Sequence, residues 1–422
     1  MEEAKIAGRP RLALIVTDAY AFNVLSRDQL EYFKDLGIEM DLYCQGTAAQ
    51  LTRLRERDVG RVIHIPFRRE PSVAWDLLAL MSLISRLIVR RYDAVVFSTP
   101  KAMFLGSLAS ALTGQRRRLS FVRGRAYETK TGFVRKIFLG MDRISFALST
   151  QVIFISNSLR QAFGEDGVRL GAKALVLGHG SSNGVDLARF RELDIAQKTS
   201  LRADMHVPEA GFVIVVPGRI VPDKGIGEAL DLIDRLGDRS DIHWYFIGWP
   251  ETDDLMARIR RRADQRVVHL DHTDRLQDWL GLADLAFLPS HREGFGNVVI
   301  EAAACGLPVL AFDVVGIQDN VQPGVTGKLV PFGDLDACES FIRQAADDRP
   351  GFRAAYVGAR SWVAERFENL TVWRNYARAY LGQAFADDLR STDQTLVGDG
   401  IGPDGPDDGQ RNDTQVKGKA SF

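Results

Sequence analysis

Two glutamates, Glu293 and Glu301, are separated by seven residues in the stretch HREGFGNVVIEAAACG, residues 291–306. Asn297 is expected to cap a helix that carries Glu301 on the same face and ends at Gly306. A helix N-terminus preceded by glycines presents free N–H groups to an anion such as a phosphate. Carboxylates accept hydrogen bonds from paired sugar hydroxyls. The stretch therefore predicts a site for two sugar rings on either side of a diphosphate.

A simpler interpretation makes both glutamates solvated acids, one in a loop and one on a helix surface. The residues around Glu301 argue against it, because 298–300 and 302–304 are all apolar. We therefore expect the Glu301 carboxyl group to be largely buried, where it needs a partner.

A second stretch, VPGRIVPDKGIGEAL (residues 216–230), supplies positive charge. An apolar strand ends at Gly218, and Arg219 and Lys224 flank a short loop that opens a helix at Gly225. Two cations at a strand end suit a diphosphate, although both could also be solvated surface residues. The stretch is not a Walker loop and lacks a full GxGxxG, so nicotinamide binding is not predicted.

Strand-like and helix-like stretches alternate along most of the chain. Residues 11–18 have the composition of a buried parallel strand. Residues 26–37 follow with helical spacing, with Ser26 as the expected N-cap and Gly37 just past the end. The alternation predicts an α/β fold with two doubly wound sheets, separated where the pattern weakens near 195–210. Ligands bind such sheets at the carboxyl ends of the strands, so the cleft between the domains is the expected site.

Length and composition are those of a soluble two-domain protein. The 422 residues exceed one core, and 45% are apolar and 26% charged. No apolar run reaches 18 residues, and the N-terminal stretch does not read as a signal peptide. Three widely spaced cysteines fit reduced thiols, so a cytoplasmic location is expected. Residues 389–422 are expected to be a disordered tail.

The net charge of −1 conceals an uneven distribution. Residues 1–190 hold 28 Lys and Arg against 18 Asp and Glu, and residues 86–143 alone hold 13 against three. Basic residues there alternate with apolar ones, as in LISRLIVRR and FVRKIFLGM. This pattern predicts attachment to an anionic membrane surface, with a solvated or core-packed domain as the alternative. No nucleic-acid motif accompanies the charge, so no nucleic-acid partner is expected.

Three elements together resemble the retaining GT-B glycosyltransferases of the family-four type: the EX7E pattern at 293–301, the GRIVPDKG loop at 218–225 and GHGSSNGVDLARF at 178–190. The N-terminal half is similar to the subgroup that extends lipid-linked oligosaccharides for bacterial capsule, exopolysaccharide or glycoconjugates. The likeness covers about residues 11–385.

The resemblance implies a GT-B fold with two Rossmann-like domains facing a cleft. An acceptor-binding domain over residues 1–195 would precede a nucleotide-sugar-binding domain over 196–365. A C-terminal helix over 366–388 would return to the first domain, before the tail at 389–422.

The resemblance also assigns roles at the donor site. Glu293 would contact the donor sugar hydroxyls, and Glu301 the ribose. The substrate cradle would be completed by Gly218, Phe295, Gly296 and Asn297.

Arg219 and Lys224 would clamp the diphosphate and stabilise its charge as it leaves. The resemblance therefore implies neither a cofactor nor a metal ion, and a nucleoside-diphosphate sugar, UDP-linked by preference, as donor.

One position departs from the subgroup. Arg123, in Arg123-Gly124, stands where the subgroup has a histidine near the C6 side of the donor sugar. A guanidinium there suits the carboxylate of a uronic acid donor, although neutral hexose and N-acetylhexosamine donors are commoner in the family. Two alternatives remain open: Arg123 contacts the acceptor's diphosphate, or it only joins the basic face.

The sequence therefore predicts a retaining, metal-independent glycosyltransferase acting on a lipid-linked or glycan acceptor. It would work in the cytoplasm, with peripheral attachment to the inner face of the membrane. Alternative functions are a nucleotide-sugar epimerase or phosphorylase of the same fold, and a non-catalytic nucleotide-sugar-binding protein of a polysaccharide assembly complex.

Overall fold

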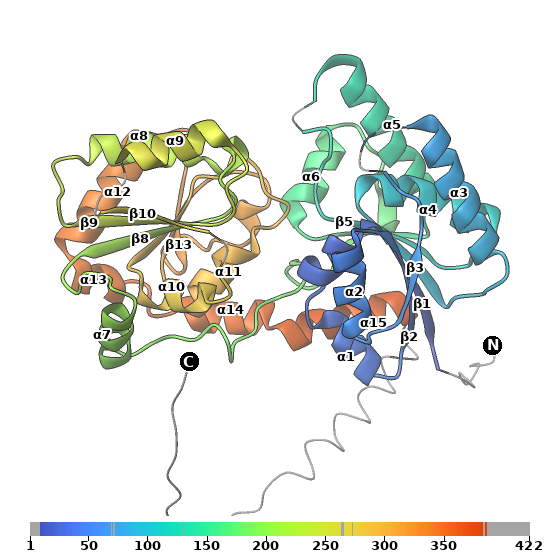
Figure 1. The fold of residues 1–422 in the computed structure, drawn as a ribbon, viewed down its shortest axis with the longest axis horizontal. Coiled ribbons are helices and arrows are strands. Elements are labelled where there is room, and N and C mark those ends of the chain that lie inside the picture. Colours follow the sequence, from blue (N-terminus) through green and yellow to red (C-terminus); the bar gives the residue numbers. More distant parts are fainter. Residues whose placement is uncertain are drawn as a thin grey trace, which may run out of the picture.

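The computed structural model describes residues 9–382 and 385, apart from 69, 71, 129, 263–265 and 272. It contains two parallel sheets, each with helices on both faces (Figure 1). The α/β class and the two doubly wound domains are thereby confirmed. The tail predicted for residues 389–422 lies outside the described residues. No helix in the described part of the chain has both the length and the apolar character needed to cross a membrane.

The N-terminal sheet has seven strands in the order β3-β2-β1-β4-β5-β6-β7. The strand order reverses between β1 and β4, which is where doubly wound sheets bind ligands. The strands are β1 (Arg11–Asp18), β2 (Glu39–Gln45), β3 (Arg61–His64), β4 (Ala94–Ser98), β5 (Arg118–Val122), β6 (Gln151–Phe154) and β7 (Ala174–Val176). The helices are α1 (Gln29–Asp35), α2 (Ala48–Glu56), α3 (Val73–Leu87), α4 (Pro100–Leu112), α5 (Gly132–Leu148) and α6 (Asn157–Glu165).

The helix predicted over 26–37 is shorter than expected. A π-helical turn, η1 (Ala21–Leu25), precedes it, and Ser26 ends that turn instead of capping α1. The guanidinium of Arg57 donates hydrogen bonds to the carbonyl oxygens of Phe22 (2.7 Å) and Ser26 (3.2 Å). These bonds satisfy one carbonyl within the turn and the carbonyl of the residue that ends it, and the local sequence pattern does not indicate this partner.

The C-terminal sheet has six strands in the order β10-β9-β8-β11-β12-β13. Its strand order reverses between β8 and β11. The strands are β8 (Phe212–Pro217), β9 (Ile242–Ile247), β10 (Val267–Leu270), β11 (Leu285–Leu288), β12 (Val309–Phe312) and β13 (Gly327–Val330). The helices are α8 (Ile226–Arg235), α9 (Asp253–Arg262), α10 (Leu276–Leu282), α11 (Asn297–Ala304), α12 (Leu335–Asp347) and α13 (Arg349–Ala354).

The region of weak pattern near 195–210 contains a helix, α7 (Ile195–Asp204), which packs against α10. A capping box starts it. The Asp194 carboxylate accepts from the N–H of Gln197 (2.8 Å), and the Gln197 side chain accepts from the N–H of Asp194 (3.2 Å).

Two last helices carry the chain from the second domain to the first: α14 (Ala359–Phe367) and α15 (Asn369–Leu381). Figure 1 shows α14 beneath the C-terminal domain and α15 beside α1. The ring of Tyr376 lies 5.1 Å from that of Phe121, and the ring of Tyr380 lies 6.0 Å from that of Phe33. These aromatic contacts fasten α15 to the N-terminal domain.

Candidate functional site

Two loops meet at the carboxyl end of the C-terminal sheet, at the point where its strand order reverses. One follows β8 and covers residues 218–225, and the other follows β11 and covers 290–296. Gly218 directly follows β8, and its N–H donates to the carbonyl oxygen of Ile247 (2.9 Å). The N–H of His291 donates to the carbonyl oxygen of Asp223 (2.9 Å), so the two loops are joined through their backbones.

Side chains join the same two loops. Lys224 forms an ion pair with Glu293, and the Ser290 hydroxyl donates to the same carboxylate (3.0 Å). Lys224 and Glu293 are only 22% and 15% exposed, so their attraction is less screened than that of a surface pair. The guanidinium of Arg292 pairs with Asp223. A predicted donor-binding acid and a predicted diphosphate-binding cation are thus held together.

Arg219 lies differently from Lys224. Its guanidinium pairs with Glu251 at 2.7 Å, and both side chains are about half exposed. The structure therefore brings Lys224, and not Arg219, into contact with Glu293. Arg219 starts the same loop as Lys224. To contact a bound diphosphate, its guanidinium would have to leave the solvent-exposed carboxylate of Glu251, a surface pair that costs little to break.

The glycines of the second loop allow a close approach between the domains. A Cβ atom at Gly294 would collide with the carbonyl oxygen of Arg123 in the N-terminal domain. Gly296 has φ +75°, a conformation that favours glycine. Phe295 between them is buried, and its ring lies 5.4 Å from that of Phe367.

Asn297 does not cap α11, contrary to the prediction. It is the first residue of the helix, Gly296 occupies the N-cap position, and no side chain caps the N–H groups. A residue already in helical conformation does not have the extended backbone from which a cap side chain reaches the first N–H groups. The Asn297 side-chain oxygen instead accepts from the hydroxyl of Ser181 (3.1 Å). The helix end therefore keeps uncapped donors next to the two loops. Gly306 follows the helix with φ +66°, as predicted.

Glu301 lies one turn inside α11 and faces a crevice of about 110 Å³ between the domains. Arg27 and Arg189 also line this crevice. Burial raises the pKa of Glu301 to about 7, and the two arginines partly oppose the increase. The carboxyl group is thus charged mainly near and above neutral pH, in a crevice lined by residues of both domains.

The raised pKa of Glu301 predicts an effect on stability. Its folded-state pKa lies above the ordinary value, so the folded protein binds more protons than the unfolded chain between about pH 4.5 and 7. This contribution to stability is lost as the pH rises through 7. Glu301→Gln should therefore raise the melting temperature of the ligand-free protein more at pH 8 than at pH 5.5. Glu365→Gln, at a 70% exposed carboxylate, is the control and should show no such difference. An equal shift for Glu301→Gln at both pH values would contradict the prediction.

The side chain of Arg123 points into the N-terminal domain. Its guanidinium lies 4.6 Å from the centre of the Phe121 ring and donates to the Leu25 carbonyl oxygen (3.2 Å) and the Ser26 hydroxyl (3.3 Å). Burial lowers the pKa of the guanidinium. Its Nε atom is buried and has no hydrogen-bond partner among the described residues. Leu25 lines the crevice that Glu301 faces, so Arg123 lies behind one wall of that crevice.

Sequence reasoning missed the residues that connect the domains beside the site. The carboxylate of Asp319 accepts from the N–H groups of Asn157 (2.8 Å) and Ser158 (3.0 Å), so it caps α6 from the other domain. The Ser158 hydroxyl accepts from the N–H of Gly316 (2.7 Å), and Ser156 donates to the Gly294 carbonyl oxygen (3.0 Å). The sequence Ile-Ser-Asn-Ser, residues 155–158, indicates that a helix starts there, because Ser and Asn are common N-cap residues. It does not indicate which residue of the other domain binds this helix end.

Known protein families match both domains. Residues 23–177 match the family model described as "Glycosyl transferase 4-like domain", and residues 211–348 match "Glycosyl transferases group 1". The chain is 29% identical, over 361 residues, to the capsular polysaccharide biosynthesis glycosyltransferase CapM of Staphylococcus aureus, with 84% of this chain and 93% of CapM covered. It is 37% identical over 195 residues to a D-inositol 3-phosphate glycosyltransferase of Jonesia denitrificans, with 43% and 46% covered.

Solved structures share the whole architecture. HepE of Anabaena, in complex with UDP and glucose, superimposes with a TM-score of 0.73 at 19% identity and covers 88% of this chain and 99% of its own. At this identity the likeness concerns the fold, and it extends over both domains.

Proposed function

We propose that this chain, which belongs to the GT-B glycosyltransferases of the family-four type, moves a sugar from a nucleoside-diphosphate sugar to a lipid-linked glycan acceptor with retention of configuration. The product would be a bacterial capsule or another surface polysaccharide, in keeping with the name of the relative CapM. The observation that carries the proposal is the pairing of Lys224 with Glu293 beside the uncapped N-terminus of α11.

The donor is proposed to be a UDP-sugar. Neighbouring structures of HepE hold UDP, UDP with glucose, and UDP-glucose, which supports this choice. The uncapped N–H groups of α11 suit the diphosphate, and Glu301, one turn further, would accept from the ribose hydroxyls. Glu293 would bind hydroxyls of the transferred sugar, with Phe295 and Gly296 completing the cradle through their backbone.

In the proposed reaction, the bond between the sugar C1 and the phosphate oxygen breaks while C1 bonds to the acceptor oxygen. The acceptor hydroxyl gives its proton to the departing phosphate, on the same face of the sugar. Negative charge develops on the diphosphate as its bond to C1 breaks, and Lys224 and Arg219 stabilise this charge. The reaction needs no metal ion in this proposal, because these two cations take the metal's role.

The acceptor is proposed to bind where the strand order of the N-terminal sheet reverses. Thr99, which follows β4 and precedes α4, has φ +71°, and the oxygen of its hydroxyl lies 2.7 Å from that of Thr17. A threonine held in this conformation is strained, and such strain gathers at functional sites. The strained Thr99, at the point where the strand order reverses, supports a role for this edge of the sheet in holding the acceptor.

The proposed lipid-linked acceptor implies a membrane surface. Helices α3, α4 and α5 lie side by side on one face of the N-terminal sheet (Figure 1). The outer surfaces of α3 and α5 expose large apolar side chains, which we call the α3–α5 surface: Val73, Leu77, Leu78, Met81, Phe133, Val134, Ile137 and Ile144. Exposed Lys136 and Arg143 accompany them on α5. Apolar side chains beside cations suit the interface of an anionic bilayer.

We expect the protein to bind vesicles that contain anionic lipids, and salt to weaken this binding, because each cation near the surface contributes about 1 kcal/mol. Phe133→Ser combined with Ile137→Ser should reduce recovery in a flotation experiment. Val357→Ser, an equally exposed apolar residue of the other domain, should not. Equal recovery with neutral and anionic vesicles would remove the membrane from the proposal.

Arg123 is proposed to influence donor choice, since its carbonyl oxygen lies against Gly294 and its Nε N–H is unused. If it serves a uronic acid donor, Arg123→His should selectively lower transfer from that donor and increase use of the neutral analogue. If it serves the acceptor's diphosphate, the same change should raise the acceptor KM with every donor. Unchanged donor preference and acceptor KM would assign Arg123 only to the packing of Phe121.

A thermal-shift screen against nucleotide-sugars tests the proposed function most simply. A donor that binds the native protein raises its melting temperature. At a donor concentration of 100 times Kd, the free energy of unfolding increases by about 2.7 kcal/mol. A bound donor that is slowly hydrolysed would exclude a non-catalytic binding protein. An altered sugar formed without any acceptor would favour an epimerase. No shift with any nucleotide-sugar would contradict the proposal.

A further inference from the structure

A buried ion network lies at the end of the C-terminal sheet opposite Glu293. At its centre is Asp284, which immediately precedes β11 and whose side chain is 0% exposed. One carboxylate oxygen, Oδ2, accepts from the guanidinium of Arg202 (2.7 Å) and the N–H of Val213 (2.9 Å). Arg202 also donates to the carbonyl oxygens of Leu282, Glu209 and Gly211. The hydrogen bonds of Oδ2 are therefore all made within the protein.

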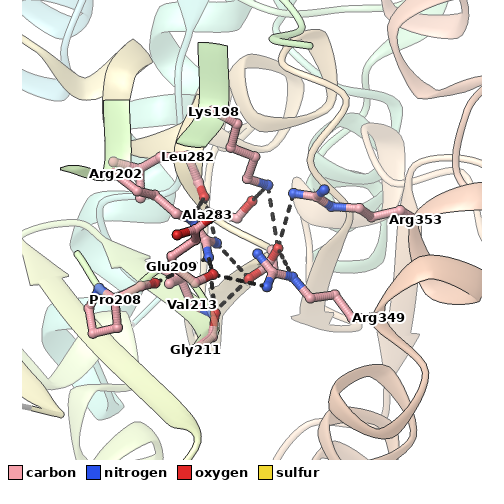
Figure 2. A network of polar contacts seen from close by, with 11 residues as sticks. Lys198, Arg202, Pro208, Glu209, Gly211, Val213, Leu282, Ala283, Arg349 and Arg353 are labelled. Carbon is pink, nitrogen blue, oxygen red and sulfur yellow. Dashed lines mark hydrogen bonds and ion pairs between the residues drawn. The ribbon is translucent and has the colours of Figure 1, made fainter. Parts of the chain in front are cut away.

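The other oxygen, Oδ1, is shared by three cations. Arg349 (2.9 Å), Arg353 (3.2 Å) and Lys198 (3.4 Å) all point to it (Figure 2). One oxygen of a carboxylate that already pairs with Arg202 cannot neutralise three further charges. Burial, which is opposed by the attraction of Asp284 and assisted by repulsion from the neighbouring arginines, lowers the pKa of Lys198 to about 7. The network is therefore short of negative charge.

These three cations face a large cavity. It has a volume of about 1030 Å³ and continues past the arginines along apolar side chains, among them Leu280, Leu307, Pro308, Tyr356 and Val357. The acids Glu192, Asp194 and Glu209 also line it, but their exposed side chains belong to its rim. Arg349 and Arg353 are 25% and 35% exposed, so a ligand can reach both guanidinium groups, although Nη1 of Arg349 also donates to the Glu209 carbonyl oxygen (3.4 Å). A cavity of this size holds a drug-sized molecule.

The cavity is separate from the proposed donor site. Asp284 lies at one end of β11, and Ser290 and Glu293 lie beyond the other. The four residues of β11 span about 13 Å, at about 3.3 Å per residue. A diphosphate held by Lys224 cannot reach the arginines, so a ligand here would bind together with the donor.

We propose that this cavity is a second binding site, for a phosphate ester with an apolar or ring-containing body. The phosphate dianion supplies the missing negative charge to Arg349, Arg353 and Lys198, and guanidinium forks match its oxygens. The body of the ligand lies along Tyr356, Leu307 and Pro308. Because this ligand would bind at the same time as the donor and away from it, its proposed role is to regulate the enzyme.

The test uses phenyl phosphate as probe, in the full chain carrying Arg219→Ala and Lys224→Ala to remove the proposed diphosphate clamp. Titration calorimetry should show one site, with higher affinity for phenyl phosphate than for inorganic phosphate because the ring contacts the apolar wall. Adding Arg349→Gln and Arg353→Gln should weaken binding at least tenfold. Adding Arg235→Gln and Arg343→Gln instead, which removes two arginines from surface ion pairs of the same domain, should leave it unchanged.

Three outcomes would overturn the proposal: no binding of phenyl phosphate, binding unaffected by the Arg349 and Arg353 changes, or an equal loss in the Arg235 and Arg343 control. If the double glutamine variant does not fold, Arg353→Lys replaces it. This variant keeps the charge but loses the fork, and it should still weaken binding. Neither donor nor transfer enters the measurement, so failure of the proposed function would leave the result intact.

Discussion

Replacing Lys224 by alanine is expected to lower kcat/KM for sugar transfer by roughly ten- to 150-fold while the fold stays intact. Lys224 is the cation that the structure holds at Glu293, beside the uncapped N-terminus of α11. A charge-assisted contact of this kind contributes roughly 1.5–3 kcal/mol. If the contact strengthens as charge develops on the leaving diphosphate, its loss appears in the rate. Steady-state kinetics with the donor identified by the thermal-shift screen measures the effect.

Two companion variants interpret the Lys224 result. Lys224→Arg should recover part of the activity, because it retains the charge but changes its geometry. Lys34→Ala removes a lysine from an exposed pair with Asp58 and should leave transfer unchanged. If Lys224→Ala keeps more than half of the activity, the diphosphate is not stabilised by this residue and the proposed clamp is wrong.

Replacing Asp284 by alanine is expected to destabilise the protein by about 3–5 kcal/mol, the usual effect of removing one partner from a buried ion pair. The variant leaves Lys198 and Arg202, both buried, without their carboxylate. Although burial opposes ionisation of Asp284, the three cations Lys198, Arg202 and Arg349 hold its pKa below the ordinary value. The stabilisation is therefore present at neutral pH and is lost only as acid protonates this carboxylate.

Thermal unfolding at pH 7.5 measures the Asp284 effect. In a domain of this size 1 kcal/mol corresponds to about 2–4 °C, so the melting temperature should fall by roughly 10 °C. Asp58→Ala removes an 89% exposed carboxylate from a surface pair and should change it little. A decrease for Asp284→Ala no larger than that for Asp58→Ala would contradict the electrostatic account of this network.

The fold was predictable because each element satisfies a local rule. Most of the buried parallel strands are continuous apolar runs, and helical spacing follows several of them in the sequence. The order of strands and helices is sufficient to define a doubly wound sheet, and the glycines and cations at the strand ends indicate its ligand edge. Lys224 and Glu293 were predicted to serve one ligand, and the structure joins them by an ion pair.

The side-chain contacts that could not be predicted are those between residues far apart in the chain. The N-cap role of Asn297 failed because Gly296 turns the chain one residue earlier, and Ser181, 116 residues away, takes the Asn297 side chain. Asp319 caps α6 across the domain boundary, a contact that no local pattern indicates. Asp284 reads as an ordinary acid before a strand, yet four cations from two helices converge on it.

The position of Arg123 shows the same limit. The family pattern marks its place in the chain, and its backbone does lie against the Glu293 loop at Gly294. The direction of its side chain depends on the nearby Phe121 and on Leu25 and Ser26, which lie 98 and 97 residues earlier in the chain. The contacts of the Arg123 guanidinium, on which a prediction of donor specificity depends, could therefore not be predicted from the sequence.

Proton NMR of the anomeric signal during donor turnover tests the proposed chemistry most directly. The protein is incubated with the α-linked UDP-sugar that stabilises it best, in the presence of EDTA, and slow hydrolysis stands in for transfer. The proposal predicts that UDP appears together with the α-anomer of the sugar, that EDTA changes the rate little, and that Lys224→Ala abolishes most of it. Initial release of the β-anomer, or a strict requirement for a divalent ion, would contradict a retaining reaction in which Lys224 and Arg219 replace a metal.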